Sequence, residues 1–125
     1  MVKLNLTDVI SAFTAISGCS AAEVTQNMAI IQSAAHLVSG LLDEKKCTAA
    51  DVDRAEYAAA AAAFYDFVCK ENARNKIVCT LTGTAEAGID YKSRIASAKS
   101  LKESALEAIK PVTVSCDFLF RTMEG

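Results

Sequence analysis

The sequence predicts a mainly α fold, a four-helix bundle-like single domain over residues 1–125, built around a long alanine-rich central helix. A small two-stranded β element is expected near the C-terminus. Three observations carry this prediction. Six successive alanines occupy 58–63 in a stretch, 48–75, that contains neither Gly nor Pro. Apolar residues recur at helical spacing in three other segments, and they alternate with polar residues in two short ones.

The central helix is expected from about Ala49 to Ala73, a length of about 35 Å. Thr48 and Asp51 have the spacing of a capping box at its start. Both sides of this helix are apolar, so it has to be enclosed. One side is aromatic and suits the domain's own core, with Tyr57, Phe64, Phe67 and Val68. The other is smooth and suits close approach of a helix from this chain or from a neighbouring copy, with Ala55, Ala59 and Ala62.

Two helices are expected before the central one. The first covers Thr7–Ile16 and ends at Gly18. The second runs from Ala21 to about Leu42, and Ser20 and Glu23 form a capping box at its start. A short charged connection at 43–47 makes the second helix and the central helix antiparallel neighbours.

After Asn75 the period changes to an alternation of Ile77, Cys79 and Leu81 with Val78, Thr80 and Thr82, which predicts a short strand over 77–82. A fourth helix is then expected from about Ser93 to Ile109, stopped by Pro111. Alternation over 112–120 predicts a second strand. Two lone strands are most stable when they pair with each other or with a neighbouring chain.

The composition limits the classes of function. The net charge of −2 and the pI near 5.4 argue against a general electrostatic grip on nucleic acid. Mean hydropathy is +0.24, which is high for a monomer and favours an interface. The longest stretch without a charged residue, 24–42, contains Gln, Asn and His, so no membrane association is expected.

Catalytic and metal-binding patterns are hard to find. The five cysteines are odd in number and contain no CxxC, so reduced thiols are expected and neither a disulfide framework nor a zinc site. His36 is the single histidine and has no carboxylate three or four residues away to orient it. Cys69 and Cys79 lack a local cationic cluster that would lower the thiol pKa. No catalytic residue and no cofactor is therefore predicted.

Two segments are candidate interfaces. One arc of the second predicted helix is polar yet uncharged, and depletion of charge is typical of a surface that a partner covers. A plain exposed face is the alternative. Its candidate interface residues are Gln32, His36 and Ser39.

The second candidate is basic, because no acid lies between Tyr91 and Lys102. It contains Lys92, Arg94, Lys99 and Lys102. Their helical angles scatter, so a solvated face competes with a contact to nucleic acid or to an acidic protein.

Four segments carry a resemblance to a known family. They are Ala55-Glu-Tyr-Ala-Ala-Ala-Ala-Ala-Ala-Phe-Tyr-Asp-Phe67, Gly88-Ile-Asp-Tyr91, Ala98-Lys-Ser-Leu-Lys-Glu-Ser-Ala-Leu-Glu-Ala-Ile109 and Asp117-Phe-Leu-Phe-Arg121. In their order the chain resembles the small head-tail connector (adaptor) proteins of tailed bacteriophages and of prophages in Gram-positive bacteria.

This resemblance implies a non-enzymatic structural subunit that assembles as a homo-oligomeric ring beneath the portal. Its partners would be the portal protein and the neck or tail proteins, with DNA passing through the ring. The implied location is the virion neck after assembly and the host cytoplasm before it. The alternative is a nucleic-acid-binding or DNA-packaging accessory that uses segment 92–102. A small cytosolic enzyme would require a cleft that unites His36 with Cys69 or Cys79.

Overall fold

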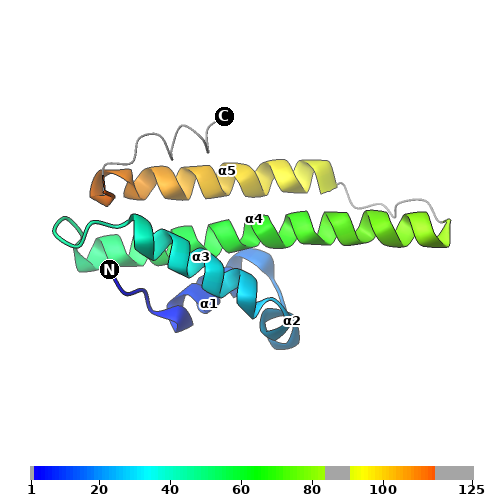
Figure 1. The fold of residues 1–125 in the computed structure, drawn as a ribbon, viewed down its shortest axis with the longest axis horizontal. Helices are drawn as coiled ribbons and strands as arrows, with labels where there is room; N and C mark the ends of the chain where they lie inside the picture. Colours follow the sequence, from blue (N-terminus) through cyan, green and yellow to red (C-terminus); the bar gives the residue numbers. More distant parts are fainter. Residues whose placement is uncertain (1, 84–90, 115–125) are drawn as a thin grey trace.

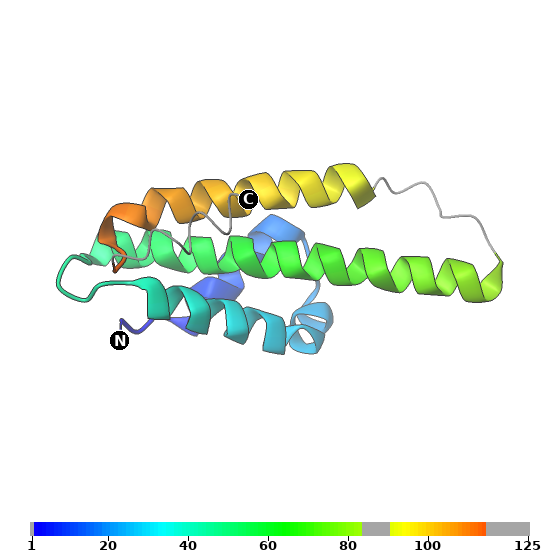
Figure 2. The same cartoon turned by 45° about the horizontal axis from the view of Figure 1, so that its top comes forward.

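The computed structural model describes residues 2–83 and 91–114, apart from the side chains of Cys79 and Tyr91. The helices are α1 (Leu6–Ser17), α2 (Ala21–Gln26), α3 (Met28–Leu41), α4 (Ala49–Thr82), α5 (Tyr91–Ile109) and the 3-10 turn η1 (Lys110–Val112). In Figures 1 and 2, α5 lies along one side of α4, and α1 and α3 lie on the other. The predicted mainly α fold around a long central helix is confirmed.

The central helix is longer than predicted. α4 contains 34 residues and spans about 50 Å, ending where Gly83 adopts the left-handed conformation with φ 69°. The predicted strand over 77–82 is therefore wrong, because this segment forms the last turns of α4. Extending a helix adds one hydrogen bond for each residue fixed, whereas a lone strand needs a partner. The Thr80 hydroxyl also donates to the Lys76 carbonyl at 2.8 Å, as threonines in helices commonly do.

The second predicted helix is interrupted at Asn27, so a single helix from Ala21 to Leu42 is wrong. The Asn27 side-chain amide donates to the Glu23 carbonyl at 2.8 Å, and its Oδ1 accepts from Lys70 Nζ of α4 at 3.0 Å. Asn27 is 6% exposed. A buried amide that is hydrogen-bonded in this way competes with the helix ladder, and α3 restarts one residue later.

The remaining helix boundaries lie close to the expected ones. α1 begins at Leu6, with the Asn5 side chain accepting from the Thr7 N–H at 3.0 Å, and ends at Gly18 with φ 70°. Both predicted capping boxes, Ser20 with Glu23 and Thr48 with Asp51, are present. α5 begins at Tyr91, two residues before the predicted start.

Only the first residues of the second predicted strand are described, since residues 115–120 lie outside the described ranges. Thr113 forms an isolated antiparallel bridge with Leu42. The Asp43 N–H donates to the Val112 carbonyl and the Val114 N–H to the Leu41 carbonyl, both at 2.9 Å. This bridge joins the segment after α5 to the connection between α3 and α4. Within residues 2–83 and 91–114 it is the only β pairing.

The middle of α4 is the centre of the core. All six alanines of 58–63 are buried, at no more than 3% exposure, between α5 on one side and α1 and α3 on the other. Phe13 of α1 packs edge-on against Phe67 of α4, with ring centroids 5.9 Å apart and planes at 88°. On α5 one apolar side faces this core, with Ala98, Ala105, Leu106 and Ile109 buried and Ile95 and Leu101 half-buried.

Candidate interaction surface

The alanine stripe that could have met a neighbouring copy lies in the interior. Ala55 and Ala59 are fully buried and Ala62 is 3% exposed. Helices of this chain therefore cover both sides of the middle of α4. Of the two predicted alternatives for the alanine stripe, a helix of the same chain covers it, and not a helix of a neighbouring copy. In this structure these residues do not form a surface that another copy could contact.

The charge-poor arc lies on the outer face of α3, with one exception. Gln32 and His36 are exposed there. Ser39 is buried, and its hydroxyl donates to the Val2 carbonyl, so it holds the N-terminal segment and does not belong to the exposed face. Leu37 is 57% exposed beside His36. The outer face of α3 thus combines uncharged polar groups with one large apolar side chain.

The basic segment on α5 does not form a continuous stripe. Lys92 is exposed and Arg94 half-buried. Lys99 Nζ lies 4.0 Å from a Glu103 carboxylate oxygen, and Lys102 Nζ lies 4.9 Å from the centre of the Tyr65 ring. Two of the four cations therefore have partners within the chain.

Two of the residues considered for catalysis, His36 and Cys69, lie on opposite sides of α4, and the side chain of the third, Cys79, lies outside the described part of the structure. His36 is on the outer face of α3. Cys69 is half-buried and hydrogen-bonds Tyr65 on the α5 side, and this contact is the main cause of the raised pKa of Tyr65. Cys19, Cys47 and Cys69 are free thiols. Within the described residues no group of three or more His, Cys, Asp or Glu side chains could hold a metal ion.

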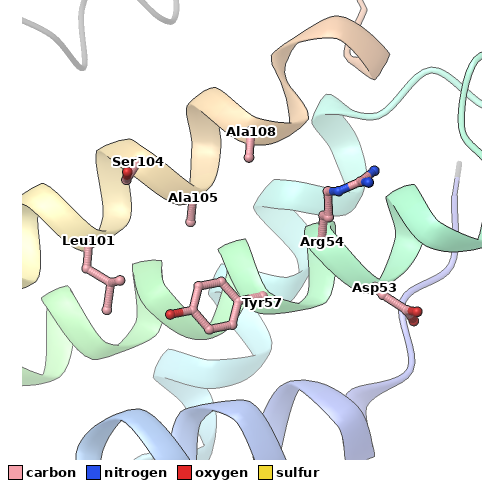
Figure 3. A pocket seen from close by; sticks show the side chains of 7 residues that line it. All are labelled: Asp53, Arg54, Tyr57, Leu101, Ser104, Ala105 and Ala108. Atoms are coloured by element: carbon pink, nitrogen blue, oxygen red, sulfur yellow. The ribbon is translucent and has the colours of Figure 1, made fainter.

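An open groove of about 530 Å³ runs between the start of α4 and the end of α5. Figure 3 shows Asp53 and Arg54 at one end, Leu101 at the other and the Tyr57 ring between them. The α5 wall is apolar apart from one serine and consists of Leu101, Ser104, Ala105 and Ala108. Tyr57 is 44% exposed here, although the helical wheel placed it with the buried aromatic residues.

The last ten residues of α4, 73–82, form a segment that we call the arm. In Figures 1 and 2 the arm extends past the start of α5. Three large apolar side chains on the arm are exposed, with Ile77 at 60%, Val78 at 49% and Leu81 at 81%. Sequence reasoning missed this surface because it treated 77–82 as a strand. The signal was nevertheless present, since Arg74, Ile77, Val78 and Leu81 follow the i, i+3, i+4, i+7 spacing of one helix face.

Glu56 is a buried carboxylate on α4, 5% exposed. Its Oε2 accepts from the Asn5 backbone N–H at 2.6 Å, which fixes the segment before α1. Burial raises the pKa of Glu56, the Asn5 hydrogen bond opposes this rise, and the nearby charges of Asp8 and Asp53 add to it.

No helix in the described part of the chain is both long and apolar enough to cross a membrane. Neither a protein-family model, nor a curated protein, nor a solved structure shows a significant match to this chain.

Proposed function

We propose that this protein is a non-enzymatic structural subunit that works by helix packing within an oligomer, in a role like that of the phage head-tail connectors it resembles. The exposed apolar face of the arm is the observation that carries this proposal. Ile77, Val78 and Leu81 are held on a continuous helix, so their positions are set before any partner arrives.

The apolar side chains of the arm remain in contact with water in the single chain, so a partner that covers them would gain stability. Burying a branched aliphatic side chain completely stabilises by about 1.5–3 kcal/mol relative to leaving it exposed. The arm places three such side chains side by side, and the outer face of α3 adds Leu37 among uncharged neighbours. Single exposed apolar residues are common, but a contiguous rigid group of them is typical of an interaction site.

Ring assembly beneath a portal is the specific form of this proposal. Electron microscopy of the protein mixed with its portal should show a closed ring under the capsid vertex. A variant with Ile77→Glu and Leu81→Glu should lose that density, and Ala73→Glu on the same arm is the matched control. Failure of the unaltered chain to bind any capsid or tail component would contradict the proposal.

The alternative, a nucleic-acid-binding or packaging accessory, is favoured by one observation. Lys92 and Arg94 form no ion pair within residues 2–83 and 91–114, unlike Lys99. If these side chains contact phosphates, DNA binding should weaken steeply with salt. K92E/R94E should then abolish binding, whereas K99E/K102E, at positions already engaged within the chain, should reduce it less. Binding without salt dependence would exclude this alternative.

A further inference from the structure

We propose that the arm of one copy docks in the α4–α5 groove of a second copy, in a head-to-tail contact. This inference rests on the proposed function and specifies which surfaces would join the subunits. It assigns the arm face, Arg74, Ile77, Val78 and Leu81, to the groove lined by Asp53, Tyr57, Leu101, Ala105 and Ala108.

The arm has the pattern of a helix that lies in a groove. Anchors at i, i+3, i+4 and i+7 on one face are the usual arrangement in such complexes. Arg74 begins this face, and Ile77, Val78 and Leu81 complete it. From Arg74 to Leu81 the helix rises about 10 Å. Leu101 and Ala108 are also seven residues apart, so the apolar wall of α5 has about the same length.

The two surfaces also carry opposite charge. Arg74 and Lys76 are exposed on the arm and form no ion pair within the described part of the chain. Two of the residues that line the groove are charged, Asp53 and Arg54, and Arg54 is bound to Asp51 at 2.8 Å. Asp53 forms no ion pair within the described residues, so a cation on the arm can pair with it, which favours this partner and its orientation.

A single molecule cannot make this contact with itself. Tyr57 and Leu81 belong to the same uninterrupted helix and are separated by 24 residues, or about 36 Å. The arm that fills the groove must therefore come from another molecule, and a second copy supplies both surfaces in equal number. When a pair of subunits makes this contact only once, the association is head-to-tail, and it closes into a ring when the rotation between subunits allows it.

Sedimentation equilibrium from micromolar to millimolar protein tests the contact. The unaltered chain should form species larger than the monomer as concentration rises. L81E should weaken association by about tenfold or more, because it places a charge in an apolar contact. A108R should do the same from the groove side. A15E, which places a charge at an exposed alanine of α1 outside both surfaces, is the control and should leave association unchanged. Helical circular dichroism should be unaltered in all three, since these positions are exposed.

Mixing the variants distinguishes this contact from a symmetric one. L81E retains an intact groove and A108R an intact arm, so an equimolar mixture should form heterodimers that grow no further. In a symmetric contact between identical patches, mixing would not restore association in this way. Association that L81E and A108R leave unchanged would overturn the inference, as would a chain that remains monomeric up to millimolar concentration. Neither result would contradict the proposed function, which is judged by binding to portal, capsid and tail components.

Discussion

Glu56 shows how one residue links the N-terminal segment to the central helix. Its carboxylate is buried and accepts one N–H from Asn5. A charge that is removed from water with one hydrogen bond is stabilised less than in solvent, and this raises its pKa. The folded protein therefore holds a proton on Glu56 more tightly than the unfolded chain does. Its contribution to stability is fully present below the ordinary glutamate pKa and is lost as pH rises through the raised value.

Substitution of Glu56 with Gln tests the direction in which Glu56 makes stability depend on pH. E56Q keeps an oxygen that can accept from Asn5 but does not titrate, so the unaltered chain should gain stability relative to E56Q as pH falls from 7 to 4. Urea unfolding of both proteins across this range measures the difference. E56A should be destabilised by about 1–3 kcal/mol at every pH, because the Asn5 N–H loses its acceptor. Parallel pH profiles for E56Q and the unaltered chain would contradict the assignment.

The interruption at Asn27 is a residue-scale feature that spacing alone does not reveal. Its apolar neighbours keep helical periodicity through the break, so the sequence predicts one helix. At the break Asn27 makes a tertiary contact, because Lys70 lies 43 positions later and reaches the buried amide from α4. Sequence patterns report local preferences, and they do not show which polar side chain will be buried opposite which.

A double-mutant cycle measures the contact between Lys70 and Asn27. K70M should destabilise by about 1–3 kcal/mol, because it leaves a buried amide oxygen without this donor. N27A removes the amide itself, so K70M should cost less in that background. The coupling energy from urea unfolding should fall at about 0.5–1.5 kcal/mol. Additive effects would show that the two side chains are not energetically coupled.

At the scale of the element, α4 combines two different environments in one helix. The stretch from Ala55 to Val68 is mostly buried, whereas the arm is mostly exposed. The alanine run made the buried half predictable, since six apolar residues in succession leave no face for water. The arm was not predictable in the same way, because β-branched residues in 77–82 suit either a strand or a helix. Residues 77–82 form a helix because they continue one that is already nucleated in the buried half of α4.

Enlarging an alanine distinguishes the two halves. A60L adds three carbons where the side chain is fully buried, and overpacking there should cost about 1–3 kcal/mol or more. A73L makes the same change at an exposed position on the arm and should alter stability by less than about 0.5 kcal/mol. The denaturant concentration at the midpoint of unfolding measures the difference, provided that the unfolding free energy depends equally steeply on denaturant in each variant. Equal costs would mean that the two halves of α4 are packed alike.

At the scale of the whole molecule, α4 is the helix against which α1, α3 and α5 all pack, so the layers share one support. The mainly α fold, the enclosure of this helix, both capping boxes and the approximate bounds of α1 and α5 are the parts of the fold that the sequence predicted. The candidate site was recovered only in part. Gln32 and His36 lie on an exposed face, but the buried alanines do not, and the groove beside Tyr57 depends on how α5 crosses α4.

Amide hydrogen exchange should separate these regions in one experiment. Backbone N–H groups of 55–68 should exchange slowest, because they open only when the layers separate, and those of the arm should exchange fastest. If the arm docks on a second copy, its protection should rise with protein concentration while that of 55–68 stays constant. Uniform protection along α4 would contradict this description.

The six central alanines have one further consequence, for conformational entropy. An alanine side chain has no rotamers to lose, so ordering this stretch restricts only the backbone, whereas fixing a longer side chain adds up to about 2 kcal/mol. The centre of the molecule is thus ordered at low entropic cost. Each alanine also buries little apolar surface when the chain folds. Most of the apolar contact between the layers is therefore made by a few larger side chains that are fully buried, among them Phe13, Ile31 and Ile109.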